Sequence, residues 1–286
     1  IHKMKKLKTK KAFLFFYAFD IVLLLIVGLV FLPFSKGKNT SASISSAYLE
    51  DNGDGITEIK IIDRSKKSMV MMTCTEFGWI GTDSMSNQNL YWPVEEGRVL
   101  KFLDAMKRKR MWEKKAENTA SWKKLSVDKE NAIEVVFSNG SRTCGHVFFG
   151  FTDDLENTIY FRTSKNSTVW ATNDEVSLYL SENDPSIWAD PYLVPLCARY
   201  VESADKLSEL RRGQLVFLKP AEHVKAFDSL DVEFDWGVKA HYDFYKKDDL
   251  VVVIPSFEGN DFLRNLSYRY SISQWTYEKF IKENKK

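Results

Sequence analysis

AFLFFYAFDIVLLLIVGLVFLPF, residues 12–34, is the stretch that decides how this chain is organised. The 23 residues hold a single charge, on Asp20. As a helix rising about 1.5 Å per residue, the stretch would be about 34 Å long, which is enough to cross a hydrocarbon core of about 30 Å. A soluble helix of this length needs a polar face toward water, and this one has none. The sequence therefore predicts a transmembrane helix over residues 12–34.

Asp20 is the one argument against insertion. A carboxylate near the middle of a span costs about 2.5–3.5 kcal/mol, whereas each Leu, Ile, Val or Phe returns about 0.3–0.6 kcal/mol. Seventeen such residues accompany Asp20, so insertion remains favourable. Two interpretations of Asp20 stay open: it reaches toward the cytoplasmic interface, or it contacts a partner helix within the membrane.

The charges that flank the span indicate its orientation. Six lysines precede it, whereas only Lys36 and Lys38 follow closely. Because basic charge stays on the cytoplasmic side, we expect residues 1–11 to be a cytoplasmic tail and the rest of the chain to lie outside. A cleaved signal peptide is the alternative. Its apolar core is usually only about 7–15 residues long, however, and Thr40-Ser41-Ala42 is a poor cleavage site.

The net charge of +2 conceals an asymmetry. Residues 1–38 carry eight Lys and one Asp, hence +7, whereas the remainder carries 33 basic and 38 acidic residues, hence −5. The basic charge therefore belongs to membrane topology, and we expect no nucleic-acid partner. The aromatic content of 14% favours a strand-rich fold.

The three cysteines, Cys74, Cys144 and Cys197, do not form a disulfide framework. An odd number leaves at least one thiol free, and no CxxC spacing suggests redox or metal chemistry. Cys74 and Cys144 lie in strand-like segments and could pair. Buried free thiols are the favoured interpretation.

Short strand-like segments and polar turns follow a flexible tether at residues 35–47. We expect an α+β, mostly antiparallel fold in two subdomains, at residues 48–198 and 199–286, divided near residues 196–200. Asn139-Gly140 predicts one hairpin, because this dipeptide readily adopts the positive φ of a tight turn. The expected strands are residues 56–63, 68–74, 76–80, 133–137, 142–149, 158–163, 168–171, 207–211, 214–218, 240–245, 250–257 and 268–273.

A helix is predicted after Pro93 from apolar positions with i, i+3, i+4, i+7 spacing. These positions are Val99, Phe102, Leu103 and Met106. The basic run at residues 107–110 fits the negative end of that helix and a solvated face better than a binding patch. A short second helix is expected with Asn173 as its cap. A last helix is expected with one apolar face made of Tyr277, Phe280 and Ile281.

Signatures of catalysis, cofactor binding and metal binding are absent from the sequence. It contains no GxxxxGK[ST] or GxGxxG loop, no HExxH and no Cys/His cluster. Asn52 and Asp54 match a calcium loop in part, but Ile61 stands where a bidentate Glu is required, so a Gly-rich turn is the better interpretation. We therefore assign no catalytic residue, no cofactor and no metal ligand.

Scattered histidines and paired carboxylates have ordinary structural explanations. His146 and His241 lie in strand-like segments, and His223 is isolated. No GxSxG motif supports a Ser-His-Asp hydrolase. Asp153-Asp154 and Asp248-Asp249 lie in predicted turns, where solvated carboxylates are common.

Aromatic motifs recur across residues 50–280. They are YWPV at 91–94, the hairpin at 133–149, IYFR at 159–162, VW at 169–170 and YSISQWTY at 270–277. With the N-terminal span, this pattern resembles an extracytoplasmic family of domains of unknown function. That family accompanies ABC transporters of the gliding-motility type and their auxiliary subunits. It has no agreed active site, so no functional residue can be carried over.

The resemblance implies a non-enzymatic accessory or scaffold subunit of an ABC-type transporter complex. Its partners would be membrane lipid, a permease, an ATPase and another auxiliary membrane subunit. It also implies a single-pass protein of the bacterial inner (cytoplasmic) membrane, with the N-terminus inside and the main domain periplasmic. The alternative is a stand-alone envelope module that binds a glycan or lipid. A hydrolase is the third hypothesis, and a concave cluster of His with Asp or Ser would revive it.

Overall fold

The computed structural model describes most of the chain beyond its N-terminal region, and Ser43–Lys286 form one compact unit. The described residues are 42–49, 55–83, 90–180, 184–194, 210–217, 224–233, 238–259 and 261–282. The predicted span at residues 12–34, Asp20 and the predicted boundary at residues 196–200 lie outside them. Within these described ranges, no helix is both long and apolar enough to cross a membrane.

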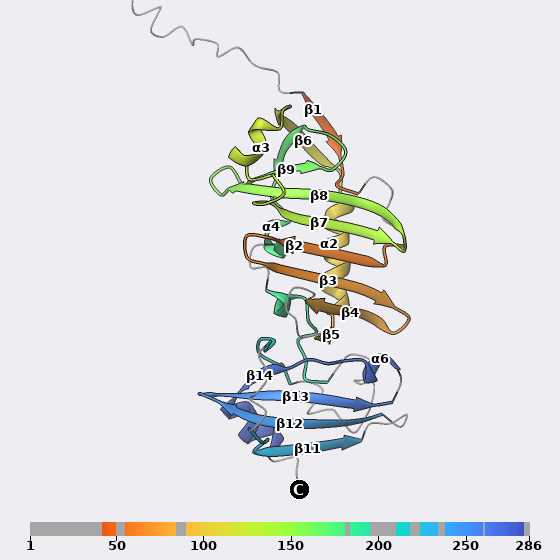
Figure 1. The fold of residues 1–286 in the computed structure, drawn as a ribbon, viewed down its shortest axis with the longest axis vertical. Coiled ribbons are helices and arrows are strands. Elements are labelled where there is room, and N and C mark those ends of the chain that lie inside the picture. The colour runs from red at the N-terminus through yellow and green to blue at the C-terminus, as the bar shows by residue number, and fades with distance from the viewer. Residues whose placement is uncertain are drawn as a thin grey trace, which may run out of the picture. The chain divides into compact units, whose positions relative to one another are not determined.

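A large antiparallel sheet accounts for the first part of the unit (Figure 1). Its ten strands are, in spatial order, β1 (Ser43–Ser46), β6 (Arg110–Ala116), β10 (Val169–Asn173), β9 (Thr158–Thr163), β8 (Arg142–Asp153), β7 (Ile133–Asn139), β2 (Glu58–Asp63), β3 (Ser68–Thr75), β4 (Gly78–Asp83) and β5 (Tyr91–Pro93). Neighbours are mostly joined by short hairpins, as the alternation of strands and turns predicts.

A second antiparallel sheet follows, made of four strands. They are, in spatial order, β11 (Asp228–Glu233), β12 (Lys239–Lys247), β13 (Leu250–Glu258) and β14 (Tyr270–Ser273). The prediction of a strand-rich, mostly antiparallel α+β fold is confirmed, and it takes the form of two sheets.

One helix of substantial length, α2 (Glu96–Lys107), lies across one face of the large sheet (Figure 1). Its four predicted apolar positions, Val99, Phe102, Leu103 and Met106, are all buried. Phe102 packs against Phe137 of β7 with ring centroids 5.8 Å apart. The remaining helical segments are α3 (Ala120–Lys124), α4 (Ser177–Leu180), η1 (Pro185–Ile187), α6 (Asp261–Arg264), α7 (Gln274–Thr276) and η5 (Tyr277–Ile281).

Several local predictions need correction. The predicted tether at residues 35–47 extends too far, because Ser43–Ser46 form strand β1 and pair with β6. Strands β5, β6 and β11 were not predicted. The described parts of the strands expected at 207–211 and 214–218 contain only isolated bridges, at Arg211 and Leu215.

Two turn and cap assignments also changed. Asn173 ends β10, and the cap of α4 is Asp174, whose Oδ1 accepts the N–H groups of Val176 and Ser177. In the predicted hairpin only Gly140 has a positive φ, at 54°. It occupies the first of two central positions between Asn139 and Arg142, which is where a type II′ turn needs glycine.

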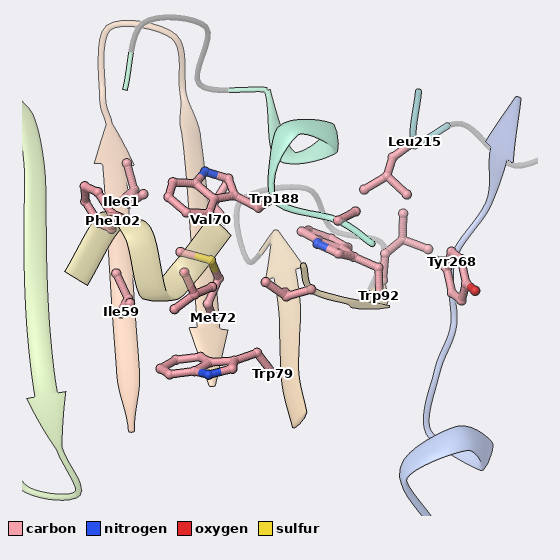
Figure 2. Close-up of a cluster of buried hydrophobic side chains, with 14 of the residues drawn as sticks. Ile59, Ile61, Val70, Met72, Trp79, Trp92, Phe102, Trp188, Leu215 and Tyr268 are labelled. Carbon is pink, nitrogen blue, oxygen red and sulfur yellow. The ribbon is translucent and has the colours of Figure 1, made fainter. Parts of the chain in front are cut away.

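A continuous core of buried apolar side chains joins the two sheets (Figure 2). Ile59, Ile61, Val70 and Met72 alternate inward from β2 and β3, as the period of two dictates. At the end of this layer, Trp92 lies between the large sheet and the two segments that carry Leu215 and Tyr268 (Figure 2). Trp92 is completely buried, and its ring is 6.1 Å from that of Phe217.

The indole of Trp92 fits only because its cross-strand partner is Gly81. A Cβ atom on Gly81 would lie 2.2 Å from Trp92 Nε1 and 2.6 Å from Cε2, which is far inside van der Waals contact. Because Gly81 on β4 has no side chain, the indole of Trp92 from β5 can pack against its backbone.

Backbone hydrogen bonds reinforce the join between the sheets. Tyr91 and Ser267 exchange both N–H···O bonds, at 2.9 and 2.8 Å. The guanidinium of Arg212 is surrounded by four backbone carbonyl groups. Its Nε donates to Asp190 O at 2.6 Å and its Nη1 to Gly213 O at 2.6 Å. Its Nη2 donates to Ser186 O at 2.9 Å and to Ala189 O at 2.6 Å.

The packing of Trp92 against Gly81 predicts that Gly81→Ala lowers the free energy of unfolding by about 1–3 kcal/mol, because overpacking forces strand β4 or the indole to shift. Urea denaturation measures the change. Gly97→Ala is the matched control: its Cβ meets nothing within 4 Å and it lies in helix α2, so stability should be unchanged or rise by up to about 1 kcal/mol. Equal effects of the two substitutions would contradict the packing argument.

The hydrogen bonds of Arg212 to four carbonyl groups predict a second loss of stability. Arg212→Lys keeps the charge but cannot reproduce a planar fork of donors to four carbonyls, so we expect unfolding to become easier by about 2–4 kcal/mol. Arg211→Lys is the control, because Arg211 is exposed and only stacks on Tyr192 at 5.5 Å. It should change stability by less than about 1 kcal/mol. A tolerated Arg212→Lys would show that the carbonyls find other donors.

Candidate functional site

The outer face of the small sheet holds the cluster most similar to a catalytic constellation among the described residues. Strand register places Asp231 of β11 opposite His241 of β12, and His241 opposite Ser256 of β13. The Nδ1 of His241 lies 2.6 Å from Asp231 Oδ1, and its Nε2 lies 3.2 Å from Asp243 Oδ1. One imidazole therefore bridges two carboxylates. The sequence placed His241 in a strand but missed β11, which supplies Asp231.

This cluster does not have the geometry of a Ser-His-Asp triad. Such a triad needs the serine hydroxyl on the imidazole nitrogen that faces away from the aspartate. Here Asp243 occupies that nitrogen, and Ser256 Oγ instead makes a long contact of 3.5 Å to the backbone oxygen of His241. The imidazole has no route to the proton of Ser256 in this arrangement.

The same geometry is unsuitable for a metal ion. Asp231 and Asp243 contact opposite nitrogens of one ring, so their carboxylates diverge instead of converging on a common point. Among the residues that the structure describes, no group of three or more His, Cys, Asp or Glu side chains has metal-binding geometry.

The two carboxylates shift the titration of His241. The hydrogen bond that His241 donates to Asp231 raises the pKa of His241 above its ordinary value, burial opposes this, and the charge of Asp243 raises the pKa further. The imidazole therefore holds its proton at a higher pH than a free histidine. It acts as a cation that offsets two aspartates on neighbouring strands.

An open hollow of about 660 Å³ adjoins this cluster. Its polar lining includes Asp231, Glu233, Glu258, Lys239 and His241. Carboxylates and cations alternate along paired strands, since Glu233 and Glu258 both lie opposite Lys239. Cross-strand charge pairs of this kind stabilise a solvated sheet face. The hollow combines these charges with the apolar residues Val232, Ala240 and Phe257, and its polar part has the chemistry of such a face.

A second polar cluster lies on the large sheet, around Glu134 of β7. Its carboxylate is almost buried and lies 2.5 Å from Arg64 Nη1 and 2.7 Å from His146 Nε2. Burial alone would raise the pKa of Glu134, but the hydrogen bonds from Arg64 and His146 outweigh it and hold the pKa below its usual range. His146 was predicted to be an ordinary strand histidine, and in the structure it partners a buried carboxylate.

Arg162 of β9 extends this cluster as a packed cation. Its Cζ lies 3.9 Å from the ring centroid of Trp122 and 3.6 Å from that of Phe148. Its Nε donates to Val127 O at 2.6 Å. Because Trp122 belongs to α3, the guanidinium fastens that helix to the sheet. Both faces of the cation are covered, so this arrangement is structural.

An enclosed apolar cavity lies inside the small sheet, against the C-terminal helical segment. It is lined by Leu193, Val194, Leu230, Tyr242, Phe244, Val253, Tyr270 and Ile281. With about 10 Å³ of space, it has room for about one water molecule and not for an organic ligand.

Other predicted features fall into ordinary roles. The thiols of Cys74 and Cys144 are both free, as favoured, but Cys74 is exposed and Cys144 is half-buried, so the expectation that both are buried was wrong. The basic run after α2 is paired: Arg108 and Arg110 lie 2.7 and 3.0 Å from Glu175 Oε2. Asp153 Oδ1 accepts the N–H groups of Leu155 and Glu156 in its turn.

Further positions cannot be placed. Asn52, Asp54, His223 and Cys197 lie outside the described residues.

Comparison with known proteins identifies no relative of this chain. No protein-family model matches this chain, nor does any curated protein or solved structure.

The His241 bridge predicts a pH-dependent contribution to stability. Because its pKa is raised on folding, the contribution is complete below the unfolded value of about 6.5 and is lost as pH rises through the folded value. NMR titration should give a pKa for His241 above about 6.5, and Asp231→Asn should lower it. Ser256→Ala is the control and should leave it unchanged. Equal shifts in both variants would refute the bridge.

Proposed function

We propose that this chain is a membrane-anchored, non-enzymatic accessory or scaffold subunit of an ABC-type transporter complex. In this proposal residues 12–34 cross the bacterial inner membrane with the N-terminus inside. The unit Ser43–Lys286 is then presented on the extracytoplasmic side. The observation that carries the proposal is the apolar run of 23 residues with lysines before it, followed directly by a folded unit.

The site chemistry supports a role in interaction and not in turnover. In the described residues, the best acid–base cluster has its histidine occupied by two carboxylates and its serine turned away. Two buried charges on the large sheet also have structural partners: Glu134 pairs with Arg64 and His146, and Arg162 packs on Trp122 and Phe148. The resemblance to domains that accompany gliding-motility-type transporters supplies the kind of complex. A permease and an ATPase on separate chains would be the partners.

Asp20 acquires a specific role in this proposal. A carboxylate within a span is costly unless it faces protein or water, and Asp is too short to reach far toward the interface. We propose that Asp20 contacts a helix of the permease or of another auxiliary subunit.

Membrane topology is the first test. The full chain should remain in the membrane after carbonate extraction, and protease added to intact spheroplasts should digest the unit Ser43–Lys286. The matched control is a variant with Leu23, Leu24 and Leu25 replaced by Glu, which raises the cost of insertion by several kcal/mol and should release the chain. Protection of the unit from protease would overturn the orientation, and a fully extractable wild-type chain would overturn the anchor.

Association is the second test. Purification of the full chain from native membranes in mild detergent should bring down a permease and an ATPase. Asp20→Ala should weaken this association while leaving the chain anchored. A clean monomer at native expression would contradict the accessory role. Ligand binding by the chain without partners, to a glycan or a lipid, would favour the stand-alone envelope module instead.

A further inference from the structure

Exposed apolar side chains gather at one end of the small sheet, where β12 turns into β13. Val224, Phe227, Leu250 and Trp275 are 41, 40, 46 and 60% exposed. Strand register brings Leu250 and Trp275 to the same end: Leu250 pairs with Lys247 across the hairpin and with Ser273 of β14, two residues before Trp275. Val224 lies three residues before Phe227 in the chain. Phe227 donates its N–H to Phe244 O on the neighbouring strand. We call these four residues the hairpin-end patch.

Lysines are built into the same surface. Lys279 Nζ lies 4.7 Å from the centroid of the Trp275 indole, and Lys246 Nζ lies 5.6 Å from that of Phe227. Both are cation–π distances. Residues 224–228, 246–250 and 274–282 together hold five lysines and four carboxylates, a net charge of +1. The rest of the extracytoplasmic chain is acidic, since residues 39–286 carry −5 in all.

The patch is held in shape from beneath. Tyr277 packs under it, with its ring 5.1 Å from Phe227 and 5.3 Å from Phe244. Its hydroxyl donates a short hydrogen bond to Asp228. Ser273 caps α7 by accepting the N–H of Thr276 at 3.0 Å, which sets where Trp275 emerges. The aromatic and aliphatic groups are therefore presented by fixed backbone.

This combination of side chains fits the surface of a phospholipid bilayer. Trp and other aromatic rings favour the headgroup level, where an apolar body meets a polar tip. Lysines contribute about 1 kcal/mol each near an anionic surface and can extend their stems along apolar groups. The cation–π pairs place ammonium groups beside the rings, so the rings can enter the interface while the ammonium groups meet lipid phosphates.

We propose that the hairpin-end patch docks on an anionic phospholipid bilayer. The partner is identified by charge complementarity. The segments that carry the hairpin-end patch have a positive net charge within an acidic unit, and Lys246 and Lys279 lie over the aromatic rings of Phe227 and Trp275. Docking is separate from the anchor at residues 12–34. It would set how the folded unit lies against the membrane.

The test uses the full chain in lipid nanodiscs made of phosphatidylcholine, or of phosphatidylcholine with phosphatidylglycerol. The phospholipids carry bromine near the headgroup, so that Trp fluorescence at that depth is quenched. We expect quenching in the phosphatidylglycerol discs that is lost in Trp275→Phe. The remaining seven tryptophans provide the unchanged background.

Two matched variants separate docking from general effects. Lys246→Glu with Lys279→Glu should reduce the quenching of Trp275, whereas Phe77→Ala removes an aromatic ring that is 47% exposed elsewhere and should leave it unchanged. Equal quenching in wild type and Trp275→Phe would overturn the proposal. If Trp275→Phe abolished co-purification of another protein without changing quenching, the patch would bind protein and the lipid proposal would also be overturned.

The test does not depend on the anchor. Elution of the chain with the nanodiscs reports insertion by itself. If the chain failed to insert, the same brominated lipids would be added as vesicles. Quenching of Trp275 would then still support docking while the anchor failed.

Discussion

The segments that lie between the two sheets are held together by one half-buried cation, Arg212. The guanidinium of Arg212 donates to the carbonyls of Ser186, Ala189, Asp190 and Gly213, and so closes two separate stretches of chain around one group. Burial lowers the pKa of Arg212, because the protein removes part of the water around its charge. Carbonyl groups left without a donor in this position would each carry a desolvation penalty. The loops between the sheets therefore have one favourable arrangement.

Apolar packing and strand register stabilise the rest of the fold around Arg212. Trp92 fills the space beside Arg212 and packs against the bare backbone of Gly81. Helix α2 covers the middle of the large sheet through Phe102. The outer faces of both sheets carry charges in paired positions, such as Glu134 with Arg64 and His146, or His241 with two aspartates. The interior is thus apolar and aromatic. The charged and titratable side chains mainly form ion pairs and hydrogen bonds with one another.

Elements with strong local patterns could be predicted from the sequence. The alternation of buried and half-buried residues in β2 and the helical spacing from Val99 to Met106 each specify a face without any distant information. The Asn139-Gly140 turn likewise marks its hairpin locally. These are the parts of the fold in which propensity and burial agree.

The parts that could not be predicted depend on partners far away in the chain. Strand β1 has the sequence SISS, and only its pairing with β6 makes it a strand. In the sequence, the start of strand β6 was interpreted as the basic end of a helix, and only the burial of Trp112 in the structure shows that the segment belongs to the sheet. The His241 bridge requires β11, whose mixed sequence DSLDVE carries no clear alternation. A cluster that spans three strands has no local signature, so the site could not be read before the register was known.

One consequence of the shared interior concerns cooperativity. Because buried side chains from Ile59 to Ile272 belong to one contiguous cluster, neither sheet can melt without exposing the apolar surface of the other. Heating should then produce a single calorimetric transition for the folded unit, with equal van't Hoff and calorimetric enthalpies. A chain truncated before β11 would lose Tyr268 and the other core residues of the small sheet, so part of the shared apolar core would face water and the chain would be a substrate for quality-control proteases.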